Sequence, residues 1–392
     1  MSTIVSSNRE ARAARSGDFA KPASPARPPL LRHWRNKLLA SPRFQKWSAR
    51  LPFSRPIART KAVDLFGLCT GFVHSQVLQA CVQLDLFHFV EAEPRSAEEV
   101  AALSGLPQEG AERLMKAGAA LDLFTPLPGG RYTLGDRGAA LLGNPSVFSM
   151  IRHHAVLYQD LADPVVLLKQ RTADTQLARY WRYSQSDAPK SAAPGEVAAY
   201  SELMAHTQDF IAEQVLAAYP FGRHRKIMDI GGGRGAFLAA AGKAHPDLGL
   251  MLCDLPAVAA LAQDTQQAGG HADRLQVFGL DAAADPLPTG ADLVTLIRIL
   301  HDHDDDRACA ILANIRKALP PGGTLLVAEP MAGTKGAEAM GDSYFGLYLW
   351  AMGSGRPRTR DELKDMLRHA GFRSVREAKT WHPVLVRCLV AR

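Results

Sequence analysis

The sequence predicts an α/β fold, in which a doubly wound, mainly parallel sheet with an antiparallel last strand follows a mainly helical, winged-helix-like domain. From residue 225 onward, strand-like apolar segments alternate with helical ones, and this alternation is typical of a parallel sheet covered by helices. Only residues 380–383 join the last two strand-like segments. Because so short a link cannot form a right-handed helical crossover, these two strands must pair antiparallel. The predicted strands are residues 226–230, 249–254, 275–280, 292–297, 324–329, 372–379 and 384–391.

The segment before the predicted sheet has the outline of a winged helix. Helical patterns cover residues 63–86, 96–103 and 111–123, and residues 124–134 suit a β-hairpin wing. Ser96 followed by Glu99 forms a capping box at the start of the second helix. Three helices and a wing therefore predict a separate domain over residues 61–150.

A DNA-binding regulator is the natural alternative for this outline. Its recognition helix should present basic residues to phosphates and base edges. The candidate helix, Gln108–Ala120, carries only Arg113 and Lys116, set against Glu109 and Glu112. We therefore expect an interaction domain that binds no nucleic acid.

Positive charge is concentrated at the N-terminal end of the 392-residue chain, whose net charge is +7. Residues 1–61 hold 14 Lys and Arg against Glu10 and Asp18, a balance of +12, which leaves 32 bases and 37 acids, or −5, for the rest. This Pro- and Arg-rich extension, residues 1–60, mixes basic with bulky apolar residues, which suits an anionic membrane surface. A solvated extension without a partner is the alternative.

The same composition favours a cytoplasmic protein. The N-terminus lacks the order of charged, apolar and small residues that marks a secretory signal. The longest uninterrupted apolar runs have the length of strands, so no transmembrane helix is expected. The five widely separated cysteines predict no disulfide framework.

A glycine-rich turn marks the candidate cofactor site. The run Gly231-Gly232-Gly233-Arg234-Gly235 stands between a predicted strand and a predicted helix, where glycine permits a tight turn and close approach of a ligand to backbone amides. The pattern also satisfies a dinucleotide fingerprint. Asp254, at the end of the next strand, would bind a ribose diol in either case, so a nicotinamide oxidoreductase stays open at this point.

Further polar residues at the strand ends favour a different cofactor. Asp229 precedes the glycines, Asp281 follows the third strand, and His301 and Asp302 follow the fourth. All lie where an open α/β sheet binds its ligand. A dehydrogenase would require only the glycine run and Asp254.

The ordered set of motifs resembles that of the bacterial and plant small-molecule O-methyltransferases, which include caffeate and acetylserotonin enzymes. The similarity covers about residues 60–392. The motifs are Asp229-x-Gly-Gly-Gly-x-Gly, Cys253-Asp254-Leu255-Pro256, Gly279-Leu280-Asp281, Arg298-Ile-Leu-His301-Asp302-His303-Asp-Asp305 and Val327-Ala328-Glu329. Within the family the chain is most similar to the carotenoid O-methyltransferases of purple phototrophic bacteria.

The resemblance implies a class I methyltransferase fold, a homodimer, and transfer of a methyl group from S-adenosylmethionine without a metal. For the carotenoid subgroup it implies a hydrophobic acceptor, the tertiary 1-hydroxyl of hydroxyneurosporene or demethylspheroidene, and a cytoplasmic protein peripheral at the photosynthetic inner membrane. A phenol or polyketide O-methyltransferase is the alternative of the same class. A ligand-sensing winged-helix regulator is the alternative from another class.

The resemblance also assigns roles to single residues. The glycine run, Asp254 and Asp281 would hold the amino acid, ribose and adenine portions of the cofactor. His303 stands where family members usually carry a Trp that stacks on adenine. The full set of expected cofactor contacts is Asp229, Gly231, Gly233, Gly235, Asp254, Leu255, Asp281, Ala282, Arg298 and His303.

His301 is the candidate general base, because histidine is the side chain most often suited to accept a hydroxyl proton. Asp302 follows it, and Glu329, on the adjacent strand, would orient the imidazole and favour its protonated form. Family members commonly carry a second Glu before an Arg-Thr pair, where this chain has Pro357. The second orienting carboxylate is therefore expected to be missing.

The acceptor pocket is expected between the two domains, with the connector of residues 151–220 along it and the cofactor domain at residues 221–392. Tyr344, Tyr348 and Met352 share one apolar helical face, for which plain core packing is the alternative. Met204 and Phe210 match family positions that face cofactor and acceptor.

Overall fold

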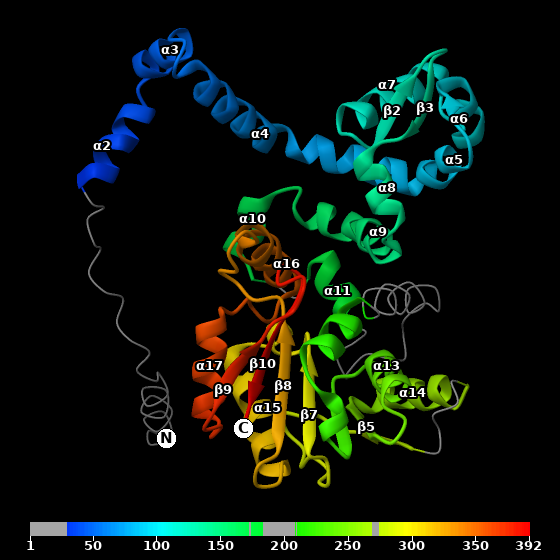
Figure 1. Cartoon of the computed structure of the whole chain (residues 1–392), viewed down its shortest axis with the longest axis vertical. Coiled ribbons are helices and arrows are strands. Elements are labelled where there is room, and N and C mark those ends of the chain that lie inside the picture. Colours follow the sequence, from blue (N-terminus) through cyan, green and yellow to red (C-terminus); the bar gives the residue numbers. More distant parts are fainter. Residues whose placement is uncertain (1–29, 172–173, 183–207, 209, 269–273) are drawn as a thin grey trace, which may run out of the picture. The chain divides into compact units, whose positions relative to one another are not determined.

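The computed structural model describes residues 30–171, 174–182, 208, 210–268 and 274–392 (Figure 1). Contacts within the chain divide it into two compact units, Met1–Ser75 and Gln76–Arg392. The helix α4 (Arg55–Gln83) runs through the boundary between them.

In the first unit, the predicted basic extension is helical from Leu30 onward. Helices α2 (Leu30–Leu39) and α3 (Pro42–Arg50) precede α4, and the hydroxyl of Ser41 caps α3 by accepting from the Phe44 N–H. Proline at the first position of α3 suits a helix start, because its missing N–H has no partner there in any helix.

Helix α4 carries apolar side chains that the single chain leaves exposed, among them Leu65 and Phe66. By length and composition alone, it is the one helix among the described residues that could cross a bilayer. The sequence led us to expect no such helix because its uninterrupted apolar runs are short. Polar residues interrupt the apolar run of α4, so that criterion did not detect it. Core helices of soluble proteins pass the same test, but these are mostly buried, whereas 17% of the apolar window of α4 is buried in the single chain.

The winged-helix outline is present at the start of the second unit. The capping box at Ser96 and Glu99 forms as predicted, and Phe87, Met115 and Phe124 fill a separate core. The elements are α5 (Leu86–Ala92), β1 (Arg95–Ser96), α6 (Ala97–Ser104), α7 (Gln108–Ala120), β2 (Phe124–Leu127), β3 (Arg131–Leu134) and α8 (Asp136–Leu142). Strands β2 and β3 pair antiparallel, as expected of a wing.

Both cations of α7 pair with acids on the same helix. The Arg113 guanidinium lies 2.6 Å from Glu109, and the Lys116 ammonium lies 3.6 Å from Glu112. A recognition helix would offer such cations to phosphates. The two acids balance the two bases, so α7 carries no net positive charge.

The main sheet has seven strands in the order β6-β5-β4-β7-β8-β10-β9. All neighbours from β6 to β8 are parallel, and β10 pairs antiparallel with both β8 and β9. This arrangement confirms the predicted fold class. The strands are β4 (Lys226–Ile230), β5 (Gly249–Asp254), β6 (Leu275–Gly279), β7 (Leu293–Ile297), β8 (Thr324–Glu329), β9 (Val375–Ala378) and β10 (Arg387–Ala391).

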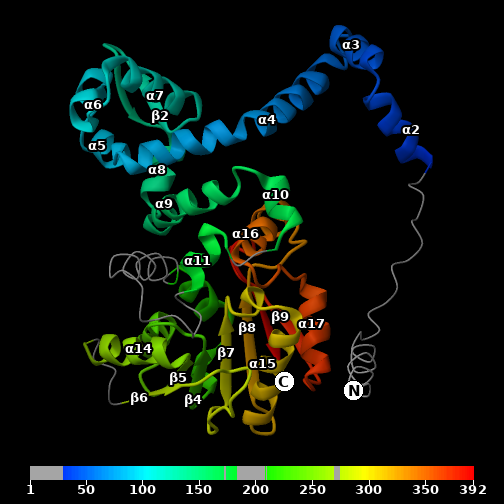
Figure 2. The same cartoon turned by 180° about the vertical axis from the view of Figure 1, so that it is seen from behind.

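Helices cover both faces of this sheet (Figures 1 and 2). On one face, α15 (Asp305–Ala318) and α17 (Arg360–His369) pack on the strands. On the other face lie α13 (Ala236–Ala244), α14 (Pro256–Ala268) and the helical residues 210–218. Because both faces are buried, the central strands are almost entirely apolar, as is typical of parallel sheets.

A further apolar cluster lies apart from the sheet. It joins the connector helices to a helix that follows β8, and its buried members include Leu167, Leu177 and Tyr348. The helices are α9 (Pro145–Asp160), α10 (Pro164–Lys169), α11 (Gln176–Arg182), the π-helical turn η3 (Ala339–Tyr344) and α16 (Phe345–Met352). Of the predicted pocket residues, Met204 lies outside the described part of the chain.

Candidate active site

Five polar residues gather at one edge of the sheet. Asp229, Asp254, Asp281, His301 and Glu329 lie at or just beyond the carboxyl ends of five neighbouring parallel strands. The strand order reverses at β4, with β5 and β6 on one side and β7 and β8 on the other. A reversal of this kind opens the crevice in which α/β sheets bind ligands.

The glycine turn after β4 needs its glycines. Gly231, Gly233 and Gly235 have φ values of 70°, 59° and 82°, in the left-handed region that side chains disfavour. A Cβ on Gly231 would also lie 2.4 Å from Cδ1 of Ile299. The turn ends at the start of α13, whose first N–H groups suit a ligand with negative charge.

Asp229 lies beneath this turn. Its Oδ1 accepts from the Thr295 hydroxyl at 2.6 Å, and a Cβ on Gly232 would lie 2.5 Å from its Oδ2. Burial raises the pKa of Asp229 to about 7. The carboxyl group therefore packs against the backbone of the turn at Gly232.

Asp254 contacts the turn from the next strand. Its Oδ2 accepts from the Gly233 N–H at 2.8 Å, and its Oδ1 accepts from the Leu255 N–H at 2.7 Å. Burial raises the pKa of Asp254 to about 6, and no cation pairs with it among the described residues. A carboxylate with free lone pairs and no cation fits a ligand that donates two hydroxyls, as a ribose does.

Asp281 and His303 lie further along the same edge. Burial opposes ionisation of Asp281, but hydrogen bonds from the Ala283 N–H at 2.9 Å and the Arg307 guanidinium at 2.8 Å hold its pKa below the usual range. The carbonyl of Ala282 accepts from the side-chain amide of Asn314. Burial lowers the pKa of His303, so its ring is a neutral surface on which an adenine could stack.

His301 lies between two carboxylates. Its Nδ1 contacts Oε2 of Glu329 at short range, and its Nε2 lies 3.1 Å from Oδ1 of Asp302. Burial lowers the pKa of His301, but the negative charges of Asp302 and Glu329 outweigh burial and raise it to about 10. The imidazole is therefore protonated at neutral pH while both carboxylates remain in place.

Both carboxylate oxygens of Glu329 have hydrogen-bonding partners. Its Oε1 accepts from the backbone N–H of Ile299 at 3.0 Å and of Leu300 at 2.7 Å, while Oε2 faces the imidazole of His301. The side chain is 2% exposed. These bonds satisfy the buried charge and fix the plane of the imidazole.

Arg298 begins the loop that carries His301, and its backbone is unusual. Its φ of 58° places a non-glycine residue in the left-handed region, a conformation that costs energy and persists where surrounding structure enforces it. Its N–H donates to the Ala328 carbonyl at 2.8 Å. Burial opposes ionisation of Asp302, but His301, and to a smaller extent His303 and the charge of Arg298, hold its pKa below the usual range. Arg298 therefore lies close to the pair of His301 and Asp302.

The tyrosines predicted for the acceptor pocket are bound by residues that sequence reasoning missed. The Tyr348 hydroxyl accepts from Nε1 of Trp181 at 2.9 Å, and it lies 2.8 Å from Nε2 of His153. Because the indole can only donate, the hydrogen of the Tyr348 hydroxyl remains available for donation to Nε2 of His153. Burial lowers the pKa of His153 to about 4, which agrees with a neutral acceptor.

The second tyrosine repeats this arrangement. The Tyr344 hydroxyl lies 2.9 Å from Nε2 of His154, whose pKa is lowered by burial. No local motif could have identified these two histidines, because they lie about 190 residues from their partners in the sequence.

Of the two remaining predicted pocket residues in the described part of the chain, one lies with the tyrosines and one does not. Met352 is buried in the same cluster as Tyr348. The ring of Phe210 instead contacts His382, between β9 and β10, with ring centres 5.5 Å apart.

Comparison with known proteins agrees with this geometry. A family model described as the O-methyltransferase domain matches residues 158–373, and one described as the O-methyltransferase dimerisation domain matches residues 66–144. The chain therefore belongs to the S-adenosylmethionine-dependent O-methyltransferase family, and it carries the domain through which this family forms homodimers.

Among individual relatives, the chain is similar to demethylspheroidene O-methyltransferase of Cereibacter sphaeroides. The two are 42% identical over 340 residues, which cover 87% of this chain and 89% of the relative. The enzyme of the same name from Rhodobacter capsulatus is 36% identical, covering 94% of this chain and 91% of the relative.

Solved structures extend the likeness to the fold. The mitomycin 7-O-methyltransferase superposes with a TM-score of 0.71 at 25% identity, covering 86% of this chain and 99% of that one. Human N-acetylserotonin methyltransferase in complex with S-adenosylmethionine gives 0.70 at 23% identity, covering 85% and 97%.

Proposed function

We propose that this chain transfers a methyl group to a hydroxyl of an acyclic carotenoid, the tertiary 1-hydroxyl of a substrate such as demethylspheroidene. The observation that carries the proposal is the carboxylate-bound His301 at the sheet edge, in a chain 42% identical to a demethylspheroidene O-methyltransferase. The site supplies a base, and the relative suggests the acceptor.

The sheet edge provides the groups that would hold the cofactor. Asp254 would accept from the ribose hydroxyls, the turn of residues 231–235 would approach the amino acid portion, and Asp281 with His303 would border the adenine. S-adenosylmethionine, when bound, supplies a methyl group already activated by its sulfonium. What remains for the protein is to place the acceptor oxygen and remove its proton.

His301 is the proposed base, acting through Nε2. In the structure that nitrogen faces Asp302, so the acceptor hydroxyl has to take the place of the Asp302 carboxylate. Removing one adjacent anion lowers the pKa of the imidazole, which can then release its proton to solvent. As the oxygen gains the methyl group, the hydroxyl proton passes to Nε2, and Glu329 stabilises the imidazolium that forms.

The aromatic cluster around Tyr344 and Tyr348, which we place along the acceptor pocket as its aromatic wall, supports an apolar acceptor. The hydroxyls of Tyr344 and Tyr348 are bound by His154, His153 and Trp181, so the wall offers ring surfaces in place of free donors. A phenol with several polar groups would gain little from such a wall. A polyene chain matches it, because it has carbon surface to bury and a single hydroxyl to place.

The domains are assigned accordingly. We propose residues 61–150 as the dimerisation domain, 151–220 as the connector along the acceptor pocket, and 221–392 as the cofactor domain. This division is supported by the family matches at residues 66–144 and 158–373.

We also propose that the cytoplasmic enzyme contacts an anionic membrane through residues 1–60. On α2, Leu31, Trp34 and Leu38 share one helical face and are exposed, and on α3 Phe44 and Trp47 lie beside a basic face. The described residues 30–61 hold nine Lys and Arg and no Asp or Glu. Such helices suit a lipid surface from which a carotenoid would be taken.

The acceptor proposal is tested with methyl-labelled S-adenosylmethionine and a matched panel of hydroxylated acyclic carotenoids, carotenoids without a hydroxyl, and simple phenols. Label is expected in the hydroxylated carotenoids alone. Label in the phenols but in no carotenoid would replace the proposal with a phenol O-methyltransferase.

A further inference from the structure

The loop that carries the base is held by a second loop far away in the sequence. Four consecutive backbone carbonyls, those of residues 300–303 (the catalytic loop), all accept hydrogen bonds from residues 354–358 (the clamp segment). The bonds run from Arg358 Nη1 to the carbonyl of Leu300 at 2.5 Å, from Arg356 N to His301 at 3.0 Å, from Ser354 Oγ to Asp302 at 2.9 Å, and from Arg358 Nη2 to His303 at 2.7 Å.

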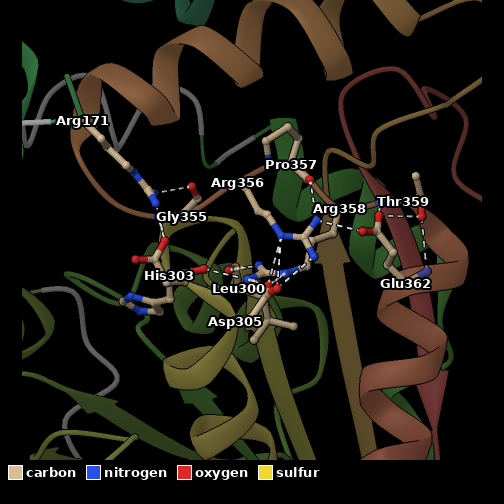
Figure 3. A network of polar contacts seen from close by, with 11 residues as sticks. Arg171, Leu300, His303, Asp305, Gly355, Arg356, Pro357, Arg358, Thr359 and Glu362 are labelled. Carbon is tan, nitrogen blue, oxygen red and sulfur yellow. Dashed lines mark hydrogen bonds and ion pairs between the residues drawn. The ribbon is translucent and has the colours of Figure 1, made fainter. Parts of the chain in front are cut away.

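Arg358 contributes two of these four bonds from a buried position. Its side chain is 1% exposed. The Arg358 guanidinium lies among the carbonyls of Leu300 and His303 and the carboxylate of Asp305, which is 2.7 Å away (Figure 3). A planar guanidinium can span several acceptors at once, whereas an ammonium cannot.

The two loops approach so closely that one position requires glycine. A Cβ on Gly355 would lie 2.0 Å from the carbonyl oxygen of His301, and the φ of Gly355 is 78°. The N–H of Gly355 also donates to Oδ1 of Asp304 at 3.0 Å, and Arg171 binds both Asp304 and the Gly355 carbonyl at 2.8 Å (Figure 3). The clamp segment is thus fixed from both sides.

We propose that Arg358 is a positioning residue for methyl transfer, which holds the catalytic loop so that the side chains of His301 and Asp302 face each other. This inference rests on the proposed role of His301 as base. Pro357, in the same clamp segment, stands where the family resemblance implies a second carboxylate. In this chain the carboxylate beside Nε2 comes from Asp302, the neighbour of His301.

The physical reason lies in the geometry of adjacent residues. Side chains that follow each other in a chain usually diverge, so the pair of His301 and Asp302 depends on the backbone angles of the turn that carries them. Arg358 fixes the carbonyls at both ends of that turn. Misplacing a reacting group by about 1 Å can cost about 100-fold in rate, so this support has a catalytic effect.

The test compares full-length Arg358→Ala, Arg358→Lys and wild type, each bound to S-adenosylhomocysteine. Histidines labelled with ¹³C at Cε1 are titrated by NMR, and the His301 signal is assigned by its loss in His301→Asn. The charged groups that face this ring are Asp302, Glu329 and His303, with Arg298 near Asp302. The titration needs no acceptor. Its result therefore tests the role of Arg358 even if the acceptor is not a carotenoid.

The titration midpoint of His301 is expected to move to lower pH in Arg358→Ala, since Asp302 is no longer held against Nε2. Millimolar guanidinium chloride should move the midpoint back, because it can enter the space left by the side chain. In turnover, kcat should fall by about 10- to 100-fold, because the loosened loop no longer holds the His301 imidazole in place for the acceptor hydroxyl that displaces Asp302. Guanidinium should restore kcat, and the KM for S-adenosylmethionine should stay near that of wild type. For Arg358→Lys, both the titration midpoint and kcat should lie between those of Arg358→Ala and wild type.

Two variants separate positioning from stability. Arg360→Ala removes an exposed guanidinium two residues further on, which pairs with Asp361 at 2.9 Å, and should change neither readout. Asp305→Asn removes the ion pair of Arg358 but leaves the carbonyl bonds, so it should lower the melting temperature without moving the midpoint. The proposal is overturned if folded Arg358→Ala, or Arg358→Lys should the alanine variant not fold, titrates like wild type.

Discussion

Nε2 of His301 lies 3.1 Å from Oδ1 of Asp302, so the nitrogen that would accept the proton is already engaged. The two side chains are adjacent in the sequence, and both lie at the end of β7. The proposed base is therefore an imidazolium in this state, and under the proposed mechanism the acceptor has to displace the Asp302 carboxylate to use it. This arrangement ties the reactivity of His301 to occupation of the acceptor site.

The pH dependence of catalysis should report this pairing. The free enzyme needs neutral His301, whose pKa is raised to about 10 once burial is outweighed by Asp302 and Glu329. Values of kcat/KM should therefore rise with pH through the neutral range and level off only near that pKa. In Asp302→Asn one of the two anions is lost, so the plateau should begin at lower pH.

The measurement is kcat/KM against pH for wild type and Asp302→Asn, with Asp306→Asn as the control. Asp306 is a neighbouring exposed carboxylate. If kcat/KM rose over the same pH range in Asp302→Asn as in wild type, Asp302 would not set the ionisation of His301.

Cofactor affinity should depend on Asp254. Replacing Asp254 with Ala removes the acceptor of two ribose hydroxyls and also frees the N–H groups of Gly233 and Leu255. Binding of S-adenosylhomocysteine should weaken by about 1–3 kcal/mol, as measured by calorimetry. Replacing Asp247, an exposed acid just before the amino end of β5, should have little effect. Equal affinities for Asp254→Ala and wild type would remove Asp254 from the cofactor site.

Glu329→Gln should lower kcat by less than loss of His301. The amide keeps a hydrogen-bonding group beside Nδ1 but removes the charge that favours the imidazolium. It also weakens the bonds from Ile299 and Leu300. Both kcat and the thermal melting curve of Glu329→Gln are measured. If the variant melted like wild type but had no turnover, Glu329 and not His301 would be the group that takes the proton.

Much of this architecture is predictable from the sequence, because it depends on local patterns. Alternating apolar segments specify the parallel sheet. The short link predicted at residues 380–383 specifies the antiparallel end, although in the structure the two strands are shorter and the link spans residues 379–386. Polar residues at the strand ends predict the site edge. The glycine turn, Asp254 and His301 were predicted in this way, and the structure brings them to one edge of the sheet.

What could not be predicted depends on contacts between distant segments. His153 and His154 meet tyrosines about 190 residues away, and Arg358 meets a loop 55 residues before it. The missing carboxylate at Pro357 suggested a weakly supported base. In the structure Asp302 lies beside Nε2 of His301, and the sequence alone does not show that two adjacent side chains face each other in this way.

Membrane contact should depend on the basic extension. Deleting residues 1–54, which ends before α4 begins, removes α2 and α3 with most of the positive charge. Sedimentation with liposomes of anionic lipid should fall, since each Lys or Arg near such a surface contributes about 1 kcal/mol. Turnover of detergent-dispersed acceptor should be retained. Binding to anionic liposomes that survives the deletion would exclude this role.

The central claim is tested most directly by a single-turnover measurement with His301→Ala. Wild type and variant are loaded with methyl-labelled S-adenosylmethionine and mixed with a hydroxylated acyclic carotenoid that wild type methylates. The rate of label transfer should fall by about 10²–10⁴-fold, the usual contribution of general acid–base catalysis, while cofactor affinity stays near wild type. A variant that transfers label at close to the wild-type rate would contradict the account, because water would then suffice to remove the proton.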